Sequence, residues 1–149
     1  MAIQFRLTLG GDIPLRQIAD IAAPEATEKP ALPGHRPYLS AGLYDQLGYA
    51  ITFTKGTNGY YSAEADNGEL WEWEPENYVN ITFRMRADDG GEMGVPNMLA
   101  TVARVLENRP ENAALIQNGN WLFLTRFNGI IRKHNVDHWY EGTLDIIPD

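Results

Sequence analysis

Four Asn-Gly pairs divide the chain and constrain its fold more than any other feature. They begin at Asn58, Asn67, Asn118 and Asn128, and residues typical of β-strands flank them. Asn-Gly is a strong hairpin signal, because both residues adopt the positive φ angles that a two-residue turn needs. Strands joined so closely run antiparallel, since a parallel crossover needs about a dozen residues or more. The sequence therefore predicts a mainly antiparallel sheet.

The middle of the chain predicts a four-strand meander. Gly56–Gly59 and Asn67-Gly68 are its expected turns, and Pro75 should block regular continuation of the third strand. Each strand is then expected to pair with the next one along the chain. The four predicted strands are residues 49–55, 60–66, 69–74 and 78–86.

Two helices are also predicted. Asp12 is expected to cap the first, and Pro14 suits its first turn, after an alternating strand at residues 3–9. The second covers residues 97–108, and every third or fourth position in it is apolar. The expected buried stripes are Leu15, Ile18, Ala19 and Ala22 in the first helix, and Met98, Leu99, Val102, Val105 and Leu106 in the second.

The other segments complete an α+β fold. Residues 24–37 hold four prolines and predict an irregular surface loop. Residues 38–48 are ambiguous: Ser40 is a candidate cap for one or two helical turns that Gly48 would end. We expect a single domain over residues 1–149, a mainly antiparallel sheet with two helices packed on one face. Three late strands are predicted at residues 113–118, 121–127 and 130–134.

Composition excludes several classes of function. The chain has no cysteine, which excludes disulfides and thiolate chemistry. Its net charge of −8 opposes direct binding to nucleic acid or to an anionic membrane, and favours a basic partner. The first residues lack the pattern of a signal peptide, and no apolar run approaches the length of a membrane span, so we expect a cytoplasmic protein.

The acidic charge is concentrated in one stretch. No lysine or arginine occurs between Lys55 and Arg84. If residues 69–74 form a strand, Trp71 and Trp73 point to one face and Glu72 and Glu74 to the other. A surface of one charge sign speeds association with a partner of the opposite sign. The acids expected to bind that partner are Glu64, Asp66, Glu69, Glu72, Glu74 and Glu76. Aromatic anchors of the kind that dominate interfaces are expected among Tyr60, Tyr61 and Trp71.

Catalytic motifs are weak by comparison. His134 and His138 would share a face only if residues 134–138 were helical, and the first lacks the glutamate that should follow it in a zinc-protease motif. We expect no metal and no cofactor. Two alternatives stay open: a hydrolase that uses Glu72 or Glu74 beside one of these histidines, and an adaptor protein whose acidity serves only solubility. Metal analysis and the neighbouring genes would separate them from an inhibitor of a basic partner.

Four segments resemble a known family. The string LWEWEPENYVNITFRM at residues 70–85 is similar to the immunity proteins of the Sit class (swarming-inhibition toxins) of myxobacteria, with relatives in actinomycetes. The likeness covers about Leu7 to His134, whereas residues 87–94 and the tail after His134 do not match. The other supporting segments are residues 39–53, 97–106 and 110–129.

The resemblance implies a protein without enzymatic activity. Such a protein binds and neutralises a cognate toxin, often a nuclease, that the same cell or its kin produces. No catalytic or toxin-contacting residue comes with the resemblance, so the acidic surface is a separate inference from charge. A homodimer is left open, because exposed strand edges can pair and two-fold dimers are the commonest homo-oligomers.

Overall fold

The computed structural model describes residues 3–86, 91–118 and 120–148. In chain order these residues form β1 (Ile3–Gly10), α1 (Leu15–Ala22), β2 (Thr27–Lys29), β3 (Tyr38–Leu43), α2 (Tyr44–Leu47), β4 (Tyr49–Thr57), β5 (Tyr61–Glu64), β6 (Leu70–Trp73), β7 (Asn77–Met85), α3 (Gly94–Asn108), β8 (Ala113–Gln117), β9 (Trp121–Phe127) and β10 (Ile130–Lys133). Three-residue 3-10 turns lie at Asp66–Gly68, Val136–His138 and Leu144–Ile146.

The strands make one sheet in the order β2-β3-β4-β7-β1-β8-β9-β5-β6, with β10 also paired to β9. All described ladders are antiparallel except a single parallel bridge between Glu64 of β5 and Trp121 of β9. The broad α+β expectation therefore holds. The expected layer of two helices on one face is incomplete as a description, because the structure adds the short helix α2 and the 3-10 turns.

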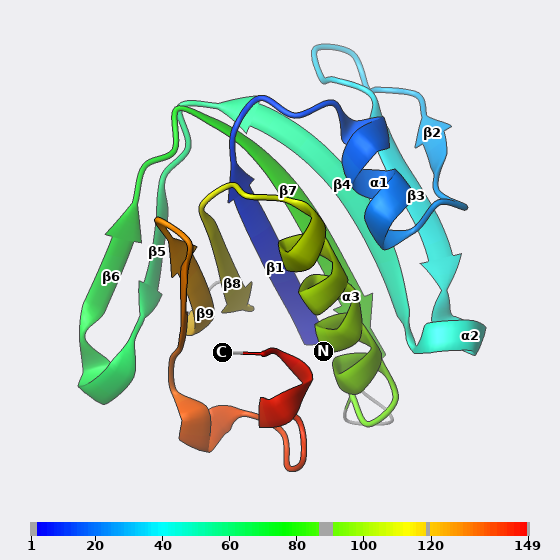
Figure 1. Cartoon of the computed structure of the whole chain (residues 1–149). Coiled ribbons are helices and arrows are strands. Elements are labelled where there is room, and N and C mark those ends of the chain that lie inside the picture. The colour runs from blue at the N-terminus through cyan, green and yellow to red at the C-terminus, as the bar shows by residue number, and fades with distance from the viewer. Residues whose placement is uncertain (1–2, 87–90, 119, 149) are drawn as a thin grey trace.

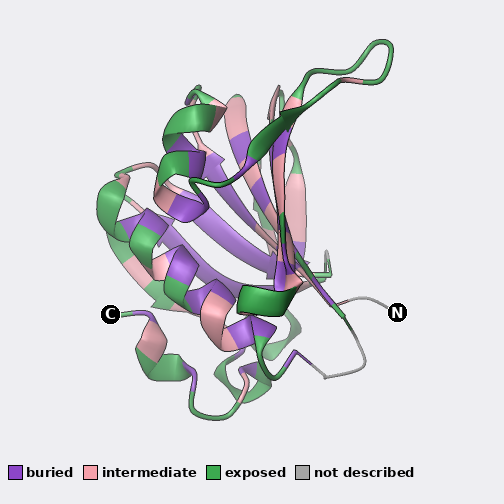
Figure 2. Ribbon diagram, turned by 90° about the vertical axis from the view of Figure 1, so that its right-hand side faces the viewer, coloured by how far each residue is buried: buried purple, intermediate pink, exposed green. Residues whose placement is uncertain are grey.

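The main core lies between the sheet and the long helices. Figure 2 shows α1 and α3 on one side of the sheet, with buried residues along the strands that they face. Alternate residues of the central strands point into this core, and the apolar stripes of the two helices fill it from the other side. All five expected stripe residues of α3 are buried, as are Ile18, Ala19 and Ala22 of α1. The central strand residues are Phe5, Leu7, Leu9, Ile51, Phe53, Ile81 and Phe83.

The predicted meander is wrong, because β4 pairs with β7 and not with β5. Residues 49–85 form one long hairpin instead. Its partner register stays constant from Tyr49 opposite Met85 to Glu64 opposite Leu70, so β5 continues β4 and β6 continues β7. Figure 1 shows both arms bending together, after which the distal half runs down beside β9.

Close packing explains why Gly56–Gly59 forms a bend and not a turn. Asn58 and Gly59 donate backbone hydrogen bonds to the carbonyls of Glu76 and Pro75, so the two arms stay connected. Asn58 takes a positive φ of 54°. The ring of Tyr78 lies against Gly59, where an added Cβ would stand 2.9 Å from its Cδ1. Turn-forming residues here serve to bend a continuous ladder.

Three local expectations also need correction. Asp12 does not cap α1, since the N-cap is Pro14 without a side-chain bond and Asp12 pairs with Lys55 at 2.7 Å. Ser40 lies within β3, although Gly48 does end a helical turn with a φ of +85°. The proline-rich segment contains β2, which pairs with β3. No helix in the described ranges is long and apolar enough to cross a membrane.

Candidate partner-binding surface

The distal half of the long hairpin has two chemically different faces. Tyr61 stands opposite Trp73 and Ala63 opposite Trp71, so these four side chains share the inner face. The pairs of Ser62 with Glu72 and of Glu64 with Leu70 share the outer face. Strict alternation in β5 and β6 thus separates aromatic from acidic side chains.

The inner face packs on a small second core on β8 and β9, formed by Ala63, Ala114, Ile116 and Leu122. Tyr61, Trp71 and Trp73 pack against it, half-buried. The Trp73 ring also meets Phe127 edge-to-face at 5.2 Å, and a Cβ on Gly10 would stand 2.8 Å from its Cζ2. The prediction that Trp71 and Trp73 face a core is confirmed, and Tyr61 joins them there. These rings hold the hairpin against the sheet.

The outer face is acidic and exposed. We define the acidic face as Glu64, Leu70 and Glu72 of the outer face together with the exposed residues Tyr60, Glu69, Glu74 and Glu76, which flank β5 and β6 in the sequence. Leu70 is 69% exposed and Tyr60 is 56% exposed. Within the described ranges, no salt bridge joins any of the five carboxylates to a lysine or an arginine. The negative charge on this face is therefore not neutralised by neighbouring bases.

Tyr60 belongs to the acidic face through a direct contact. Its hydroxyl donates a hydrogen bond to Glu72 Oε2 at 2.6 Å. This bond raises the pKa of Tyr60, because the carboxylate favours the protonated hydroxyl. The contact fixes an exposed aromatic ring among the acids. Trp71 and Tyr61, the other candidate anchors, lie on the inner face.

Asp66 differs from the other acids of the run. It accepts hydrogen bonds from the Asn135 backbone N–H at 2.7 Å and from His134 Nδ1 at 2.9 Å. Asn135 also donates through Nδ2 to the carbonyls of Glu64 and Leu122, both at 2.9 Å. Asp66 thus connects the hairpin tip to the segment after β10, and this connection helps to hold the hairpin in position.

The fixed Asp66 gives a pH-dependent prediction. The Asn135 N–H first, and then His134, lower the pKa of Asp66 below 3.8. A carboxylate with a depressed folded-state pKa stabilises the fold above its unfolded-state pKa, and this contribution is lost as the pH falls through the lowered value. Asp66→Asn is expected to reduce the free energy of unfolding at pH 7 by about 1 kcal/mol, a small value because the side chain is partly exposed.

Urea unfolding between pH 7 and pH 2 tests this prediction. The difference between wild type and Asp66→Asn should shrink as the pH falls below 3.8. Asp137→Asn is the matched control, since Asp137 is an exposed acid in the adjacent 3-10 turn. A constant difference across the pH range would contradict the role given to Asp66.

The two histidines considered for metal or acid–base chemistry lie in different surroundings. His134 Nε2 is 3.0 Å from the Thr125 hydroxyl, and its other ring nitrogen contacts Asp66. His138 stacks on Trp121 at 4.3 Å between ring centroids. The helix that a shared face would require is absent at residues 134–138: Val136–His138 form a 3-10 turn, so the two histidines do not share a helical face. In the described ranges, no group of three or more potential ligands is placed to hold a metal ion.

Sequence reasoning missed two buried polar residues with structural roles, of which Arg126 contacts the end of α3 and Asn135 contacts the hairpin. Arg126 is buried in β9 and donates to the carbonyls of Leu106, Arg109 and Glu111 at the end of α3. Asn135 holds the hairpin tip through its hydrogen bonds. Its own backbone is in the left-handed conformation, with a φ of 50°. A signal existed for the second, because every described non-glycine residue with a positive φ is an asparagine. Nothing local marked Arg126 as buried.

A family comparison now identifies the chain. The sequence model described as SitI3-like matches residues 3–143. The chain belongs to the SitI3-like family. The match extends beyond the expected Leu7–His134 at both ends and includes most of the tail. The family name indicates an immunity protein, which implies a toxin as partner and favours a non-enzymatic role. Comparisons with curated proteins and with solved structures give no match.

Proposed function

We propose that this SitI3-like protein binds and neutralises a cognate protein toxin, a basic nuclease that acts in kin discrimination or in competition between bacteria. The observation that carries the proposal is the acidic face: five exposed carboxylates gather at a two-stranded hairpin, and within the described ranges none of them forms a salt bridge with a lysine or an arginine. A nuclease needs a positive surface to hold phosphates. The acidic face is suited to compete for that surface.

The face also holds two large exposed side chains among its acids. Binding energy concentrates in a few large side chains that are surrounded by contacts excluding water. Leu70 and Tyr60 are large exposed side chains within the acidic face, and a hydrogen bond to Glu72 holds the Tyr60 side chain in place. The charges are suited to guide the encounter, while these two residues are suited to hold the complex. In this account Tyr61 and Trp71 shape the surface from the inner face of the hairpin, and Asp66 shapes it through its bonds to His134 and Asn135.

Co-expression tests the proposed function. The toxin encoded beside this gene is expressed in a sensitive host with this chain, and survival is counted. We expect survival to be restored by orders of magnitude relative to the toxin alone. An inactive toxin variant controls for expression burden. Equal killing with and without this chain would end the immunity proposal, whichever surface were responsible.

A further inference from the structure

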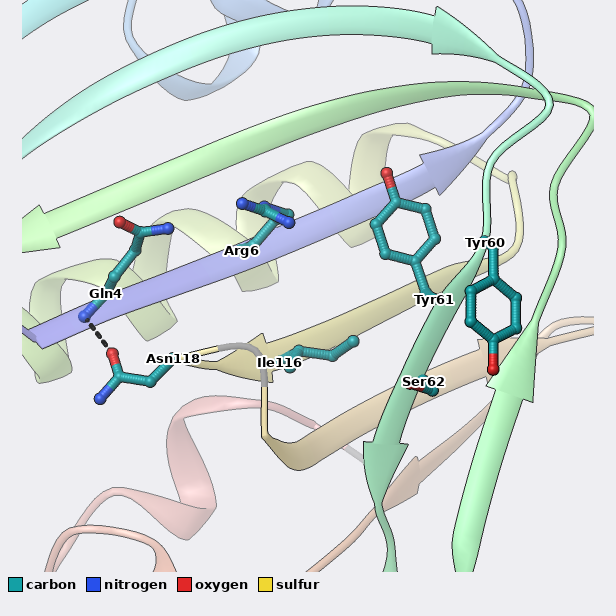
Figure 3. Close-up of a pocket in the computed structure, with 7 residues that line it drawn as sticks. All are labelled: Gln4, Arg6, Tyr60, Tyr61, Ser62, Ile116 and Asn118. Carbon is teal, nitrogen blue, oxygen red and sulfur yellow. Dashed lines mark hydrogen bonds between the residues drawn. The ribbon is translucent and has the colours of Figure 1, made fainter.

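A pocket of about 230 Å³ lies between β5 and the strands β1 and β8. The bend in the long hairpin creates it by carrying β5 over the face of the sheet that α1 and α3 leave open. Figure 3 shows Arg6 and Gln4 projecting from β1, with Ile116 and Asn118 beside them and β5 passing across. Its described lining residues are Gln4, Arg6, Tyr60, Tyr61, Ser62, Ile116 and Asn118.

Arg6 gives this pocket a charge opposite to that of the acidic face. Its Nε is shielded from solvent, yet it donates to no acceptor in the described ranges. Of the described lining residues, none is acidic, so no carboxylate of the pocket neutralises the guanidinium. A shielded N–H without an acceptor costs free energy. An external acceptor would remove that cost.

The backbone of Ser62 supplies the pocket with a hydrogen-bond donor and an acceptor. Ala65 N–H donates to Glu69 O, which makes this a hydrogen-bonded pair of the β5–β6 ladder. Hydrogen-bonded pairs alternate along an antiparallel ladder, so Ala63 and Tyr61 also face β6. Ser62 therefore directs its N–H and C=O to the opposite edge, where β5 meets β9 only at Glu64. This short edge of β5 borders the pocket.

Hydrogen bonds to neighbouring residues fix the side chains on two walls of the pocket. Asn118 Oδ1 accepts a hydrogen bond from the Gln4 backbone N–H at 2.8 Å, as drawn in Figure 3. Tyr61 exchanges hydrogen bonds with the Asn80 side chain, which fixes its ring at the opposite wall. Arg6 is then the cation at the centre of a cavity with preset walls. Its planar guanidinium pairs with a carboxylate or a phosphate through two parallel hydrogen bonds, and of these two groups an unmodified protein partner carries the carboxylate.

Size decides which carboxylate fits. Pockets for cofactors and metabolites usually exceed about 300 Å³. A cavity of about 230 Å³ suits a single side chain. We propose that this pocket receives an aspartate or glutamate side chain of the toxin, with the adjoining extended backbone pairing at Ser62. The pocket borders the acidic face, since Tyr60 belongs to both and Ser62, which also lines the pocket, stands opposite Glu72. A toxin that docks there would then contact the positive charge of Arg6 and the negative charges of the acidic face.

This inference rests on the proposed function only for the identity of the partner. The probes therefore use the free protein. Two-dimensional ¹H–¹⁵N NMR follows the Arg6 Nε–H and the Ser62 amide during additions of the tripeptide acetyl-Ala-Glu-Ala-amide. The Gln analogue, sodium acetate and sodium chloride at equal ionic strength are the comparison probes. Arg6→Gln removes the cation, and Arg84→Gln is the matched control, because Arg84 is exposed on β7 and does not line the pocket.

We expect the Glu peptide to shift both resonances saturably in the millimolar range, and acetate to shift the Arg6 signal. The Gln peptide and chloride should have no saturable effect. Arg84→Gln should behave as wild type, and the Ser62 shift should disappear in Arg6→Gln. No shift of wild type by either carboxylate would overturn the site. Saturation by acetate without peptide binding would overturn the side-chain assignment. Neither result depends on whether the chain neutralises a toxin.

Discussion

Reversing Glu72 and Glu74 to lysine is expected to slow association with the toxin at least ten-fold at low ionic strength. Both glutamates are exposed, and the double change alters the net charge by +4 on one side of β6. Electrostatic steering raises association rates by about 10- to 1,000-fold, and salt screens it. The variant should therefore lose most of the salt dependence, while its dissociation rate changes less.

The matched control is Glu28→Lys with Glu107→Lys. These residues are exposed on β2 and α3, and their reversal gives the same change in net charge away from the hairpin. Stopped-flow or biosensor kinetics between about 50 and 300 mM salt separate local from global charge effects. Equal rates and equal salt slopes for the hairpin variant and wild type would remove the acidic face from the mechanism, with immunity still possible.

Arg126→Met is expected to reduce the free energy of unfolding by about 3 kcal/mol. The Arg126 guanidinium donates to the carbonyls of Leu106, Arg109 and Glu111, close to where α3 ends. Buried carbonyls left without a donor cost about 1–3 kcal/mol each, and a cation also stabilises the negative end of a helix dipole. Arg126→Lys should reduce the free energy of unfolding by less, because the ammonium keeps the positive charge. Some loss should remain, because an ammonium cannot span all three acceptors.

Urea unfolding of both variants measures this contribution. Arg132→Met on the neighbouring strand β10 is the matched control, since Arg132 is exposed and stands opposite Thr125. We expect the control to lie within about 0.5 kcal/mol of wild type. An equally small effect of Arg126→Met would mean that α3 ends without help from β9.

The elements with a clear local pattern of apolar residues were predictable. The stripes of α1 and α3 and the alternation in β1, β6 and β7 depend on residues close in sequence, so periodicity was enough. The same alternation predicted that Trp71 and Glu72 would face opposite sides of β6. Fold class followed because short connections limit a sheet to antiparallel pairing.

The pairing of β4 with β7 was not predictable from turn chemistry. Gly56–Gly59 and Asn67-Gly68 carry equally good turn signals, but only the second lies at a hairpin end. Packing of Tyr78 against Gly59 and the backbone bond to Pro75 keep the first segment as a bend. These contacts join residues far apart in sequence, and a local pattern does not contain them.

The supports of the candidate surface depend on long-range contacts in the same way. Asp66 lay within an acidic run and was grouped with its neighbours by charge, yet it bonds to Asn135 and His134. The Arg6 pocket exists only because the bend carries β5 across β1 and β8. Charge and alternation located the acidic face, whereas tertiary packing decided which of its residues are available to a partner.

The most direct test of the account is a map of hydrogen–deuterium exchange on this chain, alone and with its toxin. We predict slower exchange in the complex at residues 60–76, centred on Leu70–Trp73, with β2, α1 and α3 unchanged. Protection confined to β2–β3 or to the helices, with the hairpin exchanging as in the free protein, would contradict it.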